Sequence, residues 1–223
     1  MGRTNFHGVS TFEQVLTMSL SDFIFKAREW SLPPVAPDKP RSREVERVKT
    51  NRKVHVSLTA TLAALYAVGV VALAPVSFQV LQVRVADALL PLAILLGWPA
   101  ILGFSAGAFI ANFFGGLGVV DVIGGSAANF LATYAAWKIG QIKMRGCWVV
   151  AVIVQVLVIT TIVGSYLSYL FQMPLEVALL GVLLGSFVAI ALLGYGLLLV
   201  LSRTNVTKLL ESHGLTIYRK KPR

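Results

Sequence analysis

Hydrophobic residues run along the chain in long blocks that carry almost no charge. The two longest blocks, residues 54–137 and 147–202, contain only four charged residues between them: Arg84, Asp87, Asp121 and Glu176. A membrane-spanning helix needs about 20 mainly apolar residues, so each block has room for more than one. The alternation of apolar and polar residues typical of a transmembrane β-barrel is absent. The pattern therefore predicts an all-α, polytopic membrane protein.

Breaks in this pattern divide the blocks into candidate spans. Residues 54–74 form the first span, which ends at Pro75, and residues 75–86 are a mixed loop. Residues 87–114 are long for a single span, and Gly97-Trp98-Pro99 interrupts them with residues that break helices. Three more spans follow, at residues 119–138, 147–170 and 176–201. The chain therefore has either five or six spans.

The basic residues decide between five and six spans. Lysine and arginine cluster at 39–53, 138–145 and 203–223. If 87–114 were one helix, the middle cluster would lie across the membrane from the first. If it is a hairpin of two helices, all three clusters share one side, and of the 20 Lys and Arg residues only Arg84 lies on the other. Cytoplasmic loops carry an excess of Lys and Arg. We therefore predict six spans, with Gly97-Trp98-Pro99 as the cytoplasmic turn after a short second span.

This topology gives a six-helix membrane domain at 54–203 in the cell membrane, with both termini in the cytoplasm. Before it, six apolar residues recur at intervals of three and four and predict an amphipathic helix on the inner leaflet: Phe12, Leu16, Leu20, Phe23, Ala27 and Trp30. A Pro-rich basic linker at 33–53, attracted to anionic lipid, would follow it. The alternative for residues 1–53 is a weakly ordered extension without a defined role. Residues 204–223 predict a basic cytoplasmic tail.

Composition narrows the range of functions. The chain of 223 residues is 56% hydrophobic, with a mean hydropathy of +0.75 and a net charge of +10. In a membrane protein, basic clusters mark cytoplasmic loops rather than a nucleic-acid surface. One cysteine excludes a disulfide framework, and three scattered histidines give no metal-binding spacing. The sequence has no P-loop and no catalytic grouping, so we expect no metal, no cofactor and no enzyme activity.

The four isolated charges fall on one membrane face under this topology. Charged residues at membrane depth are costly and are kept mainly for function or for a specific pair. The alternative is a surface Arg84–Asp87 pair with two solvated carboxylates at helix N-termini, where the helix dipole favours them. Amide side chains lie near the same face, and the candidate substrate-binding set is Gln82, Arg84, Asp87, Asn112, Asp121, Asn129 and Glu176. The segment 82–87 is expected to be a water-facing loop.

This set of side chains suits a small, planar, nitrogen-rich ligand. Carboxylates and amides accept hydrogen bonds from its N–H groups, and aromatic side chains stack on its ring.

Small residues at four-residue spacing let helices pack closely in lipid. The first span carries two such pairs, Ala60/Ala64 and Ala63/Ala67, and either could face a separate subunit. The stripes of the third and sixth spans are expected to pack within the chain.

The polar positions between residues 82 and 139 resemble those of the QueT family. The similarity rests on three blocks at fixed spacing: Gln82, Arg84, Ala86 and Asp87 before the second span, Ala111-Asn112 at the end of the third, and Gly118, Asp121 and Gly125 around the start of the fourth. The segment 181–201 also looks like the family's last helix. The resemblance covers roughly residues 54–203.

The resemblance implies a substrate-capture (S) component of an energy-coupling factor (ECF) importer for queuosine precursors. Such a component binds its ligand from outside, here a 7-deazaguanine, and docks on a transmembrane T component that carries two ATPases. It implies that an alanine pair on the first helix, Ala60/Ala64 or Ala63/Ala67, contacts the T component. Ser186 stands where the family often has an acidic or amide residue, which predicts a different substrate preference if that position touches the ligand.

In the binding hypothesis, Asp87 and Asp121 accept hydrogen bonds from the deazaguanine ring. Glu176 or another carboxylate would pair with an aminomethyl cation if the ligand has one, and Arg84 would tie down the first loop. Two hypotheses from other functional classes stay open. One is a stand-alone channel or secondary carrier that works without ATPases, and the other is a membrane enzyme or regulatory membrane subunit.

Overall fold

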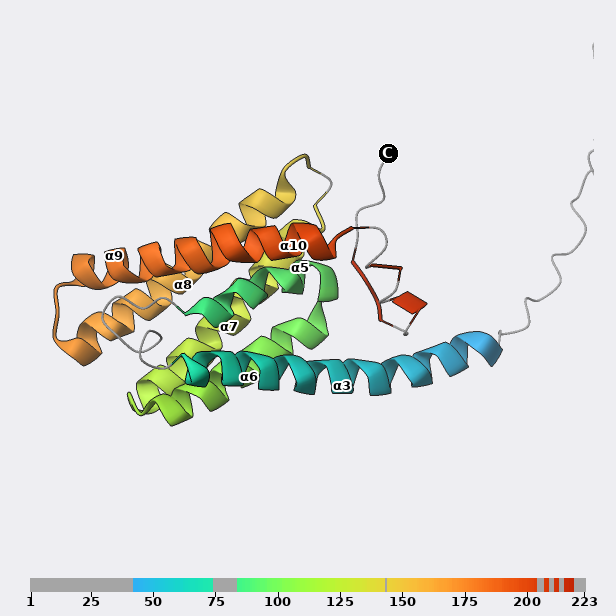
Figure 1. The fold of residues 1–223 in the computed structure, drawn as a ribbon, viewed down its shortest axis with the longest axis horizontal. Coiled ribbons are helices and arrows are strands. Elements are labelled where there is room, and N and C mark those ends of the chain that lie inside the picture. Colours follow the sequence, from blue (N-terminus) through green and yellow to red (C-terminus); the bar gives the residue numbers. More distant parts are fainter. Residues whose placement is uncertain are drawn as a thin grey trace, which may run out of the picture. The chain divides into compact units, whose positions relative to one another are not determined.

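A computed structural model describes residues 42–73, 84–142, 144–203, 207–208, 211–212 and 215–218, and within them every regular element is helical. Figure 1 shows the elements, which in chain order are α3 (Ser42–Ala72), the 3-10 helix η1 (Val85–Leu92), α5 (Ala93–Leu96), α6 (Trp98–Gly115), α7 (Val119–Gly140), α8 (Cys147–Phe171), α9 (Leu175–Ser186), the π-helix η2 (Phe187–Gly194) and α10 (Tyr195–Leu201). The chain divides into two units, Met1–Glu44 and Val45–Arg223, and the helical bundle belongs to the second.

Five helical segments in the described residues are long and apolar enough to cross a membrane. They are Arg52–Ala72, Trp98–Gly115, Val119–Gly140, Cys147–Phe171 and Leu175–Leu201, and a shorter apolar segment covers Val85–Leu96. Large apolar side chains such as Phe109, Leu157 and Leu184 are exposed on these helices. Helices that are apolar on all sides are typical of membrane spans. The prediction of an all-α, polytopic membrane protein is confirmed.

The second span is too short to cross the bilayer. The eight residues of η1 rise about 2.0 Å each and the four of α5 about 1.5 Å each, which gives about 22 Å in total. The hydrocarbon core of a bilayer is about 30 Å thick. If the end of α5 lies at one membrane surface, the start of η1 therefore lies below the other.

Gly97 alone makes the turn between α5 and α6. Its backbone, with φ 64° and ψ −135°, lies in a region that favours glycine. Helix α6 begins at Trp98, and Pro99 occupies its first turn, where the missing N–H costs no helical hydrogen bond. The tight hairpin predicted at Gly97-Trp98-Pro99 is present, and it is tighter than expected.

Tyr218, at the end of the described segment 215–218, packs against this turn. The Tyr218 backbone N–H donates to the Leu95 carbonyl at 2.8 Å, and the Tyr218 ring meets Trp137 edge-on with the ring centroids 5.5 Å apart. Trp137 also contacts Trp98, and the Lys138 ammonium lies 5.0 Å from the centroid of the Trp137 ring. These contacts gather an aromatic cluster around the C-terminal part of α7.

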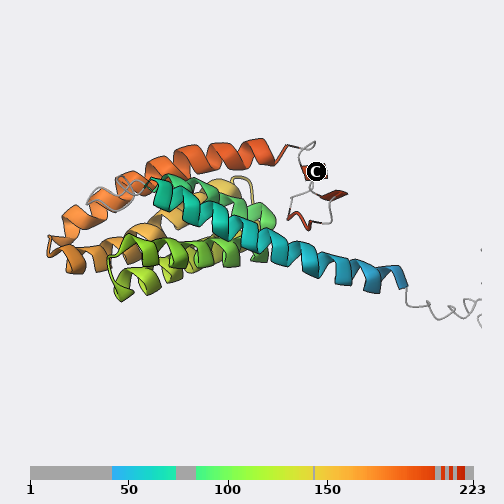
Figure 2. The same cartoon turned by 60° about the horizontal axis from the view of Figure 1, so that its bottom comes forward.

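Small residues bring α3 and α6 into backbone contact. A Cβ atom on Gly107 would lie 2.7 Å from the Ala63 carbonyl oxygen, and one on Gly103 would lie 2.9 Å from that of Thr59. Such close approach is how helices associate in lipid. Helices α6, α7, α8 and α9 each pack against the next in the chain, and Figure 2 shows α9, η2 and α10 continuing as one run, orange to red, beside them.

The structure corrects two predicted boundaries. Helix α3 begins at Ser42 rather than at Val54, and because residues 42–53 contain no proline or glycine, this part of the predicted basic linker is helical. Helix η1 begins at Val85, inside the segment predicted to be a loop. The amphipathic helix predicted between Phe12 and Trp30 lies outside the described residues.

Candidate functional site

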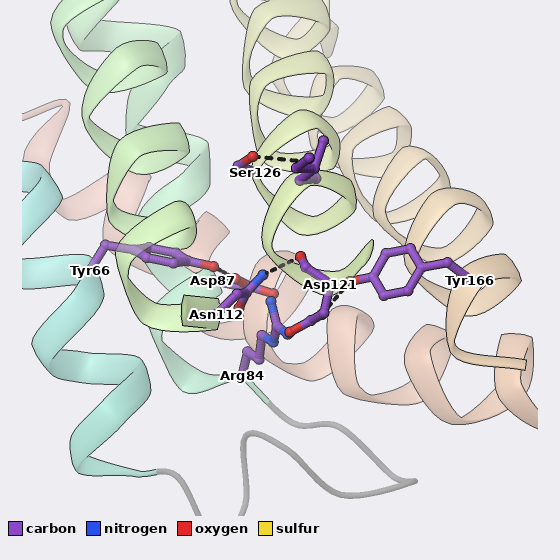
Figure 3. A network of polar contacts seen from close by, with 8 residues as sticks. Tyr66, Arg84, Asp87, Asn112, Asp121, Ser126 and Tyr166 are labelled. Carbon is purple, nitrogen blue, oxygen red and sulfur yellow. Dashed lines mark hydrogen bonds and ion pairs between the residues drawn. The ribbon is translucent and has the colours of Figure 1, made fainter. Parts of the chain in front are cut away.

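Three of the four isolated charges lie inside the bundle. Arg84, Asp87 and Asp121 expose 6%, 4% and 0% of their surface. Arg84 directly precedes η1, Asp87 lies in the first turn of η1, and Asp121 lies in the first turn of α7. Figure 3 shows these side chains gathered in one place, together with side chains from α3, α6 and α8. Because a buried charge is costly unless it is paired, their partners define the site.

Asp121 is the centre of this network. The Arg84 guanidinium lies 3.6 Å from Asp121 Oδ1, and the Tyr166 hydroxyl donates to the same oxygen at 2.8 Å. The Asn112 side-chain amide donates to the backbone carbonyl of Asp121 at 2.9 Å. One residue therefore joins η1, α6, α7 and α8.

Asp87 has a partner on the first long helix. The Tyr66 hydroxyl, on α3, donates to Asp87 Oδ1 at 2.5 Å, and Tyr66 is fully buried. Together with the Arg84–Asp121 contact, this gives each of the two buried carboxylates a partner inside the bundle.

Glycines before α7 set the position of Asp121. Gly116 and Gly118 have φ values of 73° and 98°, and a Cβ atom at either would meet nothing within 4 Å. The requirement for glycine is thus conformational rather than spatial. The Asp121 backbone N–H donates to the Gly118 carbonyl at 3.2 Å, which starts the helix.

A cavity lies beside the network. Its empty volume is about 270 Å³, including the part open to solvent, and its lining comprises Arg84, Asp87, Asn129, Ile159, Val163, Val182 and Ser186. Small-molecule sites are typically concave and largely apolar, with a few polar groups. The lining of this cavity has that character, but its enclosed part has room for about one water molecule, so a larger ligand would occupy the open part or widen the cavity.

Comparison with known families agrees with this picture of a membrane bundle around a small polar cavity. The family model described as QueT transporter matches residues 56–203, more than half of the chain. The chain belongs to the QueT transporter family. The match covers most of α3 and every element from η1 to α10, and so includes the whole network and the cavity lining. No curated protein and no solved structure gives a significant match.

The residues predicted to bind substrate in this QueT family member fall into three groups. Arg84, Asp87 and Asn129 line the cavity. Asn112 and Asp121 are fully buried in the network beside it. Glu176 is exposed in the first turn of α9 and is not part of the lining, and Gln82 lies outside the described residues.

The burial of Arg84 and Asp87 corrects the expectation that they face water in a loop. Their partners, Asp121 for Arg84 and Tyr66 for Asp87, lie inside the bundle. The alternative of a surface Arg84–Asp87 pair is wrong for the same reason. The description of a solvated carboxylate at a helix N-terminus fits Glu176 alone.

The two alanine pairs on α3 occupy different faces. Ala63 and Ala67 are buried, and Ala63 packs against Gly107 of α6. Ala60 and Ala64 are exposed.

Sequence reasoning missed the hydrogen bonds that Tyr66 and Tyr166 donate to the two buried carboxylates. The sequence does carry a signal for Tyr66, because its spacing from Ala63, Ala67 and Val70 places all four residues on one helical face. In the structure this face is buried. A tyrosine on a buried face usually has a partner for its hydroxyl.

Proposed function

We propose that this chain is the substrate-capture component of an ECF importer and holds a 7-deazaguanine in the cavity beside Arg84 and Asp87. The observation that carries the proposal is a buried network of charges adjoining a small cavity in a member of the QueT transporter family. Intramembrane charges that face a cavity are typical of substrate sites in transport proteins.

The chemistry of the lining matches the ligand class. A 7-deazaguanine presents ring N–H and exocyclic amine donors along one edge, and Asp87 and the Asn129 amide lie on the cavity wall to meet them. Asp121, Asn112 and Tyr166 hold Arg84 and the start of α7 in position. Hydrogen bonds to charged groups contribute about 1.5–3 kcal/mol each, so the loss of one carboxylate contact has a measurable effect.

The proposed partners are a T component and two ATPases. The exposed Ala60/Ala64 pair supports a docking surface on α3, whereas Ala63 and Ala67 are already used within the chain. In this proposal the basic clusters lie in the cytoplasm, and the ligand enters from outside.

The test is mass spectrometry of small molecules that co-purify with the detergent-solubilised protein, followed by uptake in vesicles. We expect a 7-deazaguanine to co-purify, and we expect uptake to require the T component, both ATPases and ATP. Uptake without these partners would favour a stand-alone carrier, and chemical conversion of the bound compound would favour an enzyme. Wild-type affinity in an Asp121→Asn variant would contradict the role given to Asp121.

A further inference from the structure

One polar residue on the cavity wall takes no part in the charged network. Ser186 is the last residue of α9, exposes 4% of its surface and lines the cavity together with Arg84 and Asp87. No hydrogen-bond partner for its hydroxyl occurs among the described residues. A buried hydroxyl on a cavity wall is therefore available to a ligand.

The cavity has two chemically different sides. Its charge and its amide come from Arg84, which directly precedes η1, from Asp87 on η1 and from Asn129 on α7. The part contributed by α8 and α9 consists of Ile159, Val163, Val182 and Ser186, and none of these side chains is charged. A ligand whose donor edge meets Asp87 therefore places its remaining substituents against aliphatic groups and one hydroxyl.

We propose that the α8–α9 wall, through Ser186, makes this site selective for a 7-deazaguanine with a neutral substituent over one with a cationic substituent. This inference rests on the proposed function. A neutral group that accepts a hydrogen bond can take one from the Ser186 hydroxyl. An ammonium group at the same wall has no carboxylate partner, and burying an unpaired charge is costly.

The carboxylates of the network do not remove this penalty. In the proposed complex Asp87 accepts both from the Tyr66 hydroxyl and from the donor edge of the ligand, and Asp121 is engaged by both Arg84 and Tyr166. Glu176, the other carboxylate expected near a ligand cation, is exposed and is not part of the cavity lining. A cationic substituent would thus have to draw a carboxylate away from partners it already has.

The deciding experiment compares two probes, 7-cyano-7-deazaguanine and 7-aminomethyl-7-deazaguanine, by titration into the purified full-length protein. We expect the wild type to bind the neutral cyano compound at least tenfold more tightly. Ser186→Asp places a carboxylate on the wall, so its preference should shift by at least tenfold toward the aminomethyl compound. Ser186→Ala, which adds no charge, should still prefer the neutral compound, with weaker binding.

Controls separate this inference from the proposed function. Ser202→Asp adds the same charge outside the cavity, after α10, and should leave the wild-type preference unchanged. Equal or tighter wild-type binding of the aminomethyl compound overturns the inference, as does a Ser186→Asp variant that binds with an unchanged ratio. If Ser186→Asp does not fold, the ratio of the wild-type affinities for the two probes decides whether the inference stands. Failure of the wild type to bind either probe overturns the proposed function, and the inference with it.

Discussion

At the scale of single residues, the site depends on hydroxyl groups as much as on charges. The Tyr66 hydroxyl is 2.5 Å from Asp87, and the Tyr166 hydroxyl is 2.8 Å from Asp121. Each buried carboxylate therefore receives a hydrogen bond from an aromatic residue on a different long helix. These tyrosines connect α3 and α8 to the charged centre without adding charge to the membrane interior.

Replacing Tyr66 with phenylalanine tests this role. Tyr66→Phe keeps the ring and removes the donor to Asp87, so a buried carboxylate loses a hydrogen bond at a cost of about 1–3 kcal/mol. We expect a lower thermal unfolding temperature in detergent and weaker ligand binding. The matched control is Tyr169→Phe, because Tyr169 exposes 72% of its surface. Equal melting temperatures for the two variants would contradict a structural role for the Tyr66–Asp87 contact.

At the scale of elements, the site lies where helical geometry departs from the α-helix. The 3-10 helix η1 carries Asp87, and the π-helix η2 begins directly after Ser186. The two elements pack against each other, and Gly194 at the end of η2 lies against the Ala88 carbonyl and Pro91. Irregular helical turns are frequent at functional sites, and here η1 carries Asp87 while η2 directly follows Ser186, two residues of the cavity lining.

Two glycines two residues apart provide a test of this packing. A Cβ atom on Gly194 would lie 2.8 Å from the Ala88 carbonyl oxygen and 2.9 Å from Pro91 Cγ, whereas one on Gly196 would meet nothing within 4 Å. We expect Gly194→Ala to destabilise the protein by about 1–3 kcal/mol, as overpacking usually does, and to weaken ligand binding. Gly196→Ala should leave both unchanged or slightly improved. The unfolding temperatures and ligand affinities of the two variants are measured side by side. Equal values for both variants would contradict this account of the packing.

The sequence was sufficient for the membrane class, for the hairpin at Gly97 and for singling out Arg84, Asp87 and Asp121, which it grouped with Glu176. Long apolar blocks and charge placement depend on local composition, which a sequence displays directly. It was not sufficient to show that Arg84 and Asp87 are buried, because their burial depends on partners that are distant in sequence. The exposure of Glu176 likewise depends on how α9 packs, and residue type alone does not reveal it.

At the scale of the whole molecule, the proposal separates ligand capture from transport. The cavity is built from η1, α7, α8 and α9, whereas the exposed Ala60/Ala64 pair lies on α3. Binding should therefore need only this chain, and uptake should need the docking surface as well.

A bulky residue on the exposed stripe tests this separation. Ala64→Leu adds volume at an exposed position, so we expect ligand affinity to stay at the wild-type level while ATP-driven uptake with the T component and ATPases falls severalfold or more. Leu65→Phe adds volume at an exposed position about 100° around the same helix from Ala64; it serves as the control and should transport normally. Normal uptake by Ala64→Leu would exclude this stripe as the docking surface.

The most direct measurement is a titration of 7-cyano-7-deazaguanine into the purified wild-type protein and an Asp87→Asn variant. The account predicts saturable binding by the wild type and at least about tenfold weaker binding by Asp87→Asn, since a hydrogen bond to a charged group contributes about 1.5 kcal/mol or more. Glu176→Gln, which neutralises the exposed carboxylate, should bind as the wild type does. Absence of wild-type binding, or equal affinity in the Asp87→Asn variant, would contradict the claim that this cavity captures the ligand.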